Sequence, residues 1–344
     1  MGFILAFSEA IMDSPQTLQQ AIQLFSDFEN CRKFMVELRW PNGVVCCPRC
    51  GSDKVTYLAK ARVYNCNVKH PKQKFSLKVG TILEDSPIGL DKWLCAMWLM
   101  VSCKNGVSSY EIHRAIGVTQ KSAWFMAHRI REALKTGGFG HTHKLGGTDG
   151  GVVEVDETFI GGKVANMHRS RRAKLNFIRD SVDRKDPYMG KTVVMGMLDR
   201  DLRQVRAKVV PNTKRPALQE QILKNVLHGS KVYTDEHTGY MGLEHKYVHD
   251  VVNHVERYVN GQVHTNGIEN FWSLLKRTLK GTYVAVEPFH LDRYVDEQVF
   301  RFNNRATKDN PLEDSDRFVL AVSQIVGKRL TFAEVTGKVG ETRF

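Results

Sequence analysis

The spacing of apolar residues changes near the middle of the chain, and the change separates two kinds of secondary structure. Over 14–38 and over 90–135, apolar residues recur every three or four positions, which is the repeat of a helix that buries one face. From residue 152 onward, short apolar runs alternate with helical stretches, as in a sheet with helices on its faces. The pattern predicts a multidomain α/β protein with a largely helical first part.

The stretch 14–38 is expected to form a single helix. Ser14 and Pro15 have the residue types of an N-cap and of a first helical position. Leu18 and Phe25 follow at helical spacing, so we expect this helix to serve packing alone.

Residues 90–135 are expected to form three helices, of which the last two have the pattern of a helix-turn-helix. Ser108 and Glu111 have the spacing of a capping box. Gly117 marks the turn, and Thr119 is expected to cap the following helix. The residues expected to contact DNA are Gln120, Lys121 and Ser122 at base edges, with Arg129 nearer the phosphate backbone. A helical hairpin that only packs against its neighbours would show the same local pattern.

Strands and helices alternate after residue 152. Strands are predicted at 152–156, 191–200, 204–210 and 231–235, and helices at 213–228 and 265–280. Asp156 closes the first of these strands and Asp235 closes the last. Because sites in α/β sheets form at strand ends, both carboxylates are expected to lie at such a site.

The helix predicted at 265–280 has an apolar stripe and a polar face. Its stripe, which should face the sheet, consists of Ile268, Phe271, Leu275 and Leu279. Glu269 and Lys276 are seven residues apart and therefore share a neighbouring face. Together with Asp156 and Asp235, Glu269 gives three carboxylates that can converge on two divalent metal ions, an arrangement that serves phosphoryl transfer. An amphipathic surface helix with an exposed Glu and Lys is the alternative interpretation.

The charge of the chain favours a polyanionic partner. Its 344 residues carry a formal net charge of +13, and cations that neutralise phosphates release counterions from nucleic acid. Many basic proteins bind no nucleic acid, but this charge together with the helix-turn-helix pattern and the zinc module described below leads us to expect DNA as the partner. No apolar run approaches the roughly 18–20 residues of a membrane span, and residues 1–12 lack the basic start of a signal peptide, so we expect a cytoplasmic protein without a membrane partner.

A basic segment follows the first predicted strand, at 166–174. We expect it to form a loop at the mouth of the site that contacts DNA through Arg169, Arg171 and Arg172. A charged loop without fixed structure is an alternative that is compatible with this interpretation.

Seven cysteines, an odd number with uneven spacing, indicate a metal site rather than a disulfide framework. Cys47 and Cys50 form a Cys-x-x-Cys knuckle, which is a good zinc half-site. Position 69 holds Lys where a second knuckle would need Cys, so His70 is expected to join Cys66 in the other half-site. Cys46 competes with Cys47 for the first position, and a degenerate ribbon that has lost its zinc is the alternative.

These features divide the chain into six segments. They are an N-terminal helical segment at 1–40, a zinc ribbon at 41–85, a helix-turn-helix at 86–136, a Gly-rich linker at 137–150, a catalytic domain at 151–310 and a C-terminal tail at 311–344.

The order of these features resembles a known family, the bacterial insertion-sequence transposases with an N-terminal zinc ribbon and a DDE-type, ISXO2-like catalytic domain. The motifs that carry it are EVDETFIGGK (154–163), YTD (233–235) and HTNGIENFWSLLKR (264–277). The resemblance covers nearly the whole chain and is most specific at 156–163, at 264–283 and in the 33 residues between Asp235 and Glu269. Two departures stand out: the fourth cysteine of the ribbon is missing, and the third acidic position varies among relatives, so Asn266 or Asn270 could take part.

The resemblance implies a ribonuclease H-like mixed α/β catalytic domain that holds two Mg²⁺ or Mn²⁺ ions through Asp156, Asp235 and Glu269. It implies that Lys276 contacts DNA, and the adjacent Arg277 is assigned the same role. The expected activity is cleavage at the terminal inverted repeats of the element, followed by joining of the 3′ hydroxyls to target DNA. At least a dimer on DNA is expected by the same analogy.

Two other function classes are compatible with parts of the sequence. A transcription regulator would use the ribbon and the helix-turn-helix but would leave three carboxylates at strand and helix positions unexplained. A metal-dependent nuclease would share the three acids but would not join strands.

Overall fold

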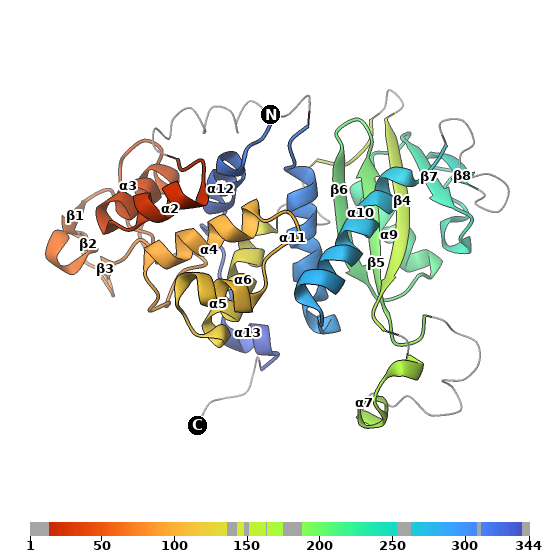
Figure 1. The fold of residues 1–344 in the computed structure, drawn as a ribbon. Coiled ribbons are helices and arrows are strands. Elements are labelled where there is room, and N and C mark those ends of the chain that lie inside the picture. Colours follow the sequence, from red (N-terminus) through yellow and green to blue (C-terminus); the bar gives the residue numbers. More distant parts are fainter. Residues whose placement is uncertain are drawn as a thin grey trace. The chain divides into compact units, whose positions relative to one another are not determined.

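The structure is a computed structural model in which residues 14–135, 143–147, 151–162, 164–174, 188–252, 263–307 and 311–338 are described (Figure 1). The chain divides into two compact units. The first unit consists of residues 1–135 together with 304–344, and the second consists of residues 136–303.

The first unit begins with two helices in place of the single helix predicted over 14–38. They are α2 (Leu18–Phe25) and α3 (Phe28–Arg39). Asp27 divides them, because its carboxylate accepts a hydrogen bond from the backbone N–H of Glu29 and so caps the start of α3. The expected start was also wrong: Thr17 caps α2 in a capping box with Gln20, which leaves Ser14 and Pro15 outside the helix.

A small antiparallel sheet follows in the order β1-β2-β3. Its elements are β1 (Val55–Leu58), the 3-10 turn η1 (Ala59–Ala61), β2 (Val63–Cys66) and β3 (Lys74–Phe75). Val55 lies opposite Cys66 in the register of the first hairpin. This sheet is the ribbon expected within 41–85.

The three helices expected over 90–135 are present. They are α4 (Leu90–Ser102), α5 (Ser109–Ile116) and α6 (Gln120–Leu134). The capping box of Ser108 with Glu111 is confirmed, and so is the N-cap at Thr119. Gly117 ends α5 with φ of 61°, a left-handed conformation that glycine adopts without strain.

Residues 311–344 are not a tail, and this correction changes the boundaries of the units. They contain α12 (Asp314–Ser323) and α13 (Phe332–Thr336). Phe318 of α12 is fully buried and contacts the rings of Phe25, Phe34 and Trp98. The core of the first unit therefore needs both ends of the chain, and the second unit ends at residue 303 instead of 310.

The second unit is built on a five-stranded mixed sheet of the order β6-β5-β4-β7-β8. Its strands are β4 (Val152–Ile160), β5 (Thr192–Asp199), β6 (Gln204–Val210), β7 (Lys231–Asp235) and β8 (Val248–Val252). Strands β4, β5 and β6 are antiparallel neighbours, whereas β7 pairs with β4 and β8 in parallel. The architecture is the ribonuclease H-like fold expected from the sequence, and β8 is a strand that the sequence pattern had not indicated.

Helices cover both faces of this sheet (Figure 1). Helices α10 (Asn266–Thr278) and α11 (Leu291–Asn303) pack on one face, where their apolar residues join Val194 and Val205 in one buried cluster. Helix α9 (Arg215–Asn225) packs on the other face. The shorter elements are η2 (Val164–Asn166), α7 (Arg169–Lys174), η3 (Thr238–Tyr240), η4 (Leu279–Tyr283) and η5 (Pro288–His290).

The described part of the expected linker, residues 143–147, packs onto the second unit. Leu145 is buried and pairs with Val226, and the backbone N–H of Gly146 donates a hydrogen bond to Asp199. The Gly-rich composition had suggested a free connection, but Leu145 belongs to the core under α9. Among the described residues, no helix has both the length and the apolar character needed to cross a membrane.

Candidate active site and metal centre

Strand register brings Asp156 and Asp235 level on adjacent strands. In the parallel pair of β4 and β7, Val152 lies opposite Lys231 and Glu154 lies opposite Tyr233. Two residues further along both strands are Asp156 and Asp235, so the two side chains point to the same face of the sheet. Asp235 ends β7 as expected, but Asp156 was wrongly placed at a strand end: β4 continues to Ile160 because it pairs with β5 along its whole length.

Helix α10 reaches Asp156 through a tryptophan. The indole N–H of Trp272 donates a hydrogen bond of 2.9 Å to Oδ2 of Asp156. Gly196 lies opposite Asp156 on β5, and a Cβ atom there would come within 2.6 Å of the Trp272 ring. The glycine therefore makes room for the indole, and the indole fixes one oxygen of the carboxylate.

Burial and crowding change the electrostatics of the acids at this site. Burial, and then the nearby charges of Glu157 and Asp235, raise the pKa of Asp156 to about 7. Burial also raises the pKa of Glu157 to about 7, although the Tyr240 hydroxyl donates a hydrogen bond to its Oε2. Negative charges held this close without a cation favour a positive ion between them, and carboxylate oxygens are ligands that Mg²⁺ accepts.

Two residues near this site were missed by the sequence reasoning. Glu157 follows Asp156 directly, and the alternation along a strand turns its side chain to the opposite face, where Tyr240 and His237 lie. Tyr240 is fully buried and comes from η3, just after β7. The adjacent acidic pair was visible in the sequence, but its partners came from a loop with no pattern of its own.

Glu269 lies in the first turn of α10. Its carboxylate is exposed and accepts a hydrogen bond of 2.9 Å from the Thr265 hydroxyl. The carboxylate oxygens of Asp156, Asp235 and Glu269 do not all lie within 4.8 Å of one another. Glu269 does precede Trp272 by one helical turn, so it shares the side of α10 that reaches Asp156. The apolar stripe expected on this helix is confirmed, since all four of its residues are buried.

A buried ion pair ties the start of α10 to β4. Glu154 is 1% exposed, accepts a hydrogen bond of 2.9 Å from the backbone N–H of Ile268, and pairs with Arg200 at 2.5 Å. The guanidinium of Arg200 also donates to the carbonyl oxygen of His264 and lies over the ring of Tyr233 on β7. Arg200 thus contacts the segments that carry each of the three acids.

Of the basic residues expected to contact DNA, Lys276 lies beside this site. Lys276 is exposed and lines the same cleft as Asp235. Arg277 and Arg169 are exposed, and Arg172 is half-buried. The residues Arg169, Arg171 and Arg172 belong to the short helix α7 and not to the expected loop.

The expected DNA contacts of the helix-turn-helix fall into two groups. Gln120, Lys121 and Ser122 occupy the first turn of α6, and Lys121 is exposed with its ammonium 5.1 Å from the ring of Phe332. Arg129 is only 4% exposed, and its guanidinium donates a hydrogen bond to the carbonyl oxygen of Glu84. Because that guanidinium is used within the first unit, we no longer assign Arg129 a contact with DNA.

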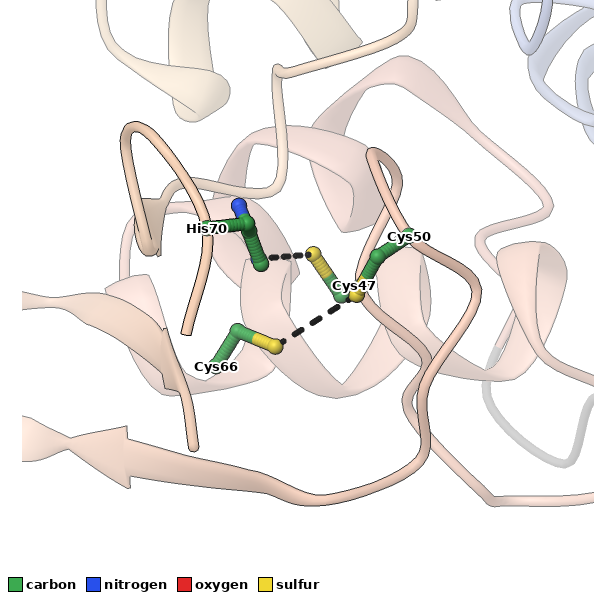
Figure 2. Close-up of side chains that lie close together, drawn as sticks. All are labelled: Cys47, Cys50, Cys66 and His70. Carbon is green, nitrogen blue, oxygen red and sulfur yellow. Dashed lines mark hydrogen bonds between the residues drawn. The ribbon is translucent and has the colours of Figure 1, made fainter. Parts of the chain in front are cut away.

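The expected zinc ligands lie together at one end of the ribbon (Figure 2). The ligand atoms of Cys47, Cys50, Cys66 and His70 all lie within 4.8 Å of one another. Sγ of Cys47 is 3.5 Å from Nε2 of His70, and Sγ of Cys50 is 3.6 Å from Sγ of Cys66. Zinc with Zn–S of about 2.3 Å and Zn–N of about 2.0 Å in tetrahedral geometry needs edges of roughly 3.5–3.8 Å, so the four side chains fit this ion.

The surroundings of these ligands suit a metal as well. Nδ1 of His70 lies 2.8 Å from the carbonyl oxygen of Pro71, which can only accept, so Nε2 is left with the lone pair that a metal needs. Burial acts to raise the pKa of Cys47, but hydrogen bonds from the backbone of Arg49 and Cys50 outweigh it and lower that pKa to about 7. Cys46 is not part of the cluster, so Cys47 takes the position for which the two had competed.

Fold and site together define a class of protein in which a zinc ribbon precedes a ribonuclease H-like domain. Residues 148–303 match the ISXO2-like transposase domain, and residues 26–68 match the transposase zinc-ribbon domain. Together the two segments span more than half of the chain. The chain therefore carries an ISXO2-like transposase domain preceded by a transposase zinc ribbon.

A curated relative comes from an archaeal mobile element. The chain is 24% identical over 263 residues to a protein described as "Uncharacterized protein in transposable element ISH50" from Halobacterium salinarum. The alignment covers 75% of this chain and 85% of the relative.

Proposed function

We propose that this protein is a DNA transposase that cleaves the ends of its insertion sequence and joins the resulting 3′ hydroxyls to target DNA. The observation that carries the proposal is the level placement of Asp156 and Asp235 on parallel strands, with α10 bonded to Asp156 through Trp272. The same helix places Lys276 in the cleft beside Asp235.

Asp156, Asp235 and Glu269 are the proposed ligands of two Mg²⁺ or Mn²⁺ ions. When bound, the ions supply Lewis acidity at the scissile phosphate and at the attacking oxygen. Trp272 occupies only Oδ2 of Asp156, which leaves Oδ1 available as a ligand. Glu269 is exposed at the start of α10 and would turn from Thr265 toward the aspartates.

The protein residues orient the DNA and the nucleophile. Lys276 offers a positive charge to a phosphate oxygen within the cleft. Water attacks first and releases a 3′ hydroxyl, and that hydroxyl then attacks a phosphate of the target strand in line. No covalent bond between protein and DNA forms, so no Ser or Tyr nucleophile is needed.

DNA recognition is assigned to two groups of residues. Gln120, Lys121 and Ser122 would read the terminal inverted repeats from the first turn of α6. The basic side chains that would contact phosphates are Arg169, Arg171, Arg172, Lys276 and Arg277. Because two ends must be cleaved and joined, we propose a homodimer or larger assembly on DNA.

A strand-transfer assay tests the proposal. Purified protein would be mixed with a labelled duplex that ends in the inverted repeat, with plasmid target, and with Mg²⁺ or no divalent ion. We expect joining only with Mg²⁺, and a loss of about a thousandfold or more in Asp156→Asn, Asp235→Asn and Glu269→Gln, since removing a metal ligand removes most transition-state stabilisation.

A further variant tests whether Glu269, and not the neighbouring acid Glu157, is the third metal ligand. Glu157→Gln serves as the matched acid-to-amide control and is expected to retain more activity than Glu269→Gln. A fully active Asp235→Asn protein would rule out the proposed site. Cleavage without joining would indicate a nuclease, and specific binding without cleavage would indicate a regulator.

A further inference from the structure

A cleft of about 700 Å³ opens beside Asp235 in the second unit. The residues that line it include two acids, Glu157 and Asp235, two lysines, Lys191 and Lys276, and two aromatic residues, Phe159 and Tyr188. Pockets of roughly 300–1,000 Å³ hold compact ligands, so the cleft suits one or two nucleotides better than a duplex.

The two aromatic rings form an exposed platform. Their centroids are 3.8 Å apart with an angle of 20° between the planes, which is a stacked pair. Tyr188 is nevertheless 49% exposed, so the stack is a wall of the cleft and not part of the core. Stacking on aromatic side chains is how proteins hold unpaired bases, because every base has a π-face.

Two cations flank this platform. Nζ of Lys191 lies over the Tyr188 ring, 5.4 Å from its centroid, and Lys276 of α10 lines the same cleft. Neither lysine forms an ion pair with any residue that the structure describes. Their charges are therefore available to the phosphates of a nucleotide whose base stacks on the platform.

We propose that this cleft binds an unpaired nucleotide next to the scissile phosphate, with its base stacked on the Phe159–Tyr188 platform and its phosphates between Lys191 and Lys276. The inference rests on the proposed transposase function and adds a step to it: the terminal base pairs open before cleavage. Opening costs a few kcal/mol in a duplex and least where the base is already unpaired, so binding in the cleft compensates for this cost.

A comparison of two DNA substrates tests this step through activity. One substrate has fully paired ends, and the other has unpaired nucleotides on both sides of the cleavage site. Tyr188→Ala is expected to slow cleavage of paired ends about ten- to a hundredfold, since stacking is worth about 1–3 kcal/mol per base, and to slow cleavage of the opened ends much less. Tyr188→Phe keeps the ring and should behave like the wild type.

The control for surface aromatics is Phe289→Ala, because Phe289 is 60% exposed and lies outside the cleft. It should leave both rates unchanged. Equal losses on both substrates, or equal losses in Tyr188→Phe and Tyr188→Ala, would overturn the proposal. Cleavage followed by joining to target DNA by the wild type in the same experiment would show that the transposase function holds even if the cleft is wrongly assigned.

A second measurement does not depend on cleavage. Asp235→Asn protein would be bound to ends that carry the photoreactive base 5-iodouracil, either next to the cleavage site or in the middle of the repeat. Crosslinking to the peptide with Tyr188 is expected only from the position next to the cleavage site. Crosslinking from neither position, or equally from both, would contradict a nucleotide site in the cleft.

Discussion

Asp156 shows how much a single carboxylate depends on its neighbours. It sits on the central strand of the sheet, one oxygen is held by the Trp272 indole, and the charges of Glu157 and Asp235 are close. An acid in this position is stable as a protonated group or as a metal ligand, and unstable as a free anion.

The stability of the metal-free protein should therefore fall as the pH rises. In the unfolded chain these acids ionise near their ordinary values of 3.8 and 4.5, but in the folded state Asp156 and Glu157 ionise near 7. Between about pH 4 and pH 7 the unfolded state binds fewer protons, so the free energy of unfolding decreases with pH, and it levels off above 7. Urea unfolding at pH 5 and pH 8 in Mg²⁺-free buffer, with zinc retained, would measure this decrease.

In the Asp156→Asn variant, the free energy of unfolding should decrease less between pH 5 and pH 8 than in the wild type. Added Mg²⁺ should stabilise the wild type more at pH 8 than at pH 5. Asp201→Asn, in the exposed turn after β5, is the matched control and should follow the wild type. A wild-type stability that rises from pH 5 to pH 8 without Mg²⁺ would refute this account of the site.

At the scale of elements, the ion pair of Glu154 and Arg200 joins the parts that carry the three acids. Removing one partner of a buried pair leaves an uncompensated charge, which costs about 3–5 kcal/mol. Glu154→Gln should therefore lower the free energy of unfolding of the second unit by about that amount, and hydrogen exchange should increase in β4 and α10. The control is Glu220→Gln, because the ion pair of Glu220 with Lys224 is exposed at both ends and its loss should change the free energy of unfolding much less. Equal effects of the two substitutions would show that the buried pair does not hold α10.

The sequence predicted those elements whose signals are local. The capping box at Ser108 and Glu111, the cap at Thr119 and the apolar stripe that begins at Ile268 all lie within a few residues of what they determine. The extension of β4 past Asp156 was missed, because Glu157 and Thr158 are polar and become buried only through partners distant in sequence. Helical spacing could place Glu269 on a face of α10. For the same reason, it could not show that the guanidinium of Arg129 would bond to the carbonyl oxygen of Glu84.

At the scale of the whole molecule, the last part of the chain belongs to the core of the first unit. Phe318→Ala should lower the free energy of unfolding of that unit by about 3–5 kcal/mol, the usual cost of removing a fully buried ring. The matched control is Tyr110→Ala, since Tyr110 is 60% exposed on α5 of the same unit. Thermal unfolding together with binding to the inverted repeat would measure the difference. If Phe318→Ala and Tyr110→Ala behave alike, residues 311–344 are the tail that their position had suggested.

The chain order of the two units also bears on how the protein is made. Ser14 and Ser315 are hydrogen-bonded but 301 residues apart, so the first core cannot close until nearly the whole polypeptide has been synthesised. At translation rates of about 5–20 residues per second, the sheet unit has emerged completely before α12 leaves the ribosome. A nascent chain therefore acquires its carboxylate site before its helical core is complete. A chain that stops early holds the carboxylate site without the complete helical core.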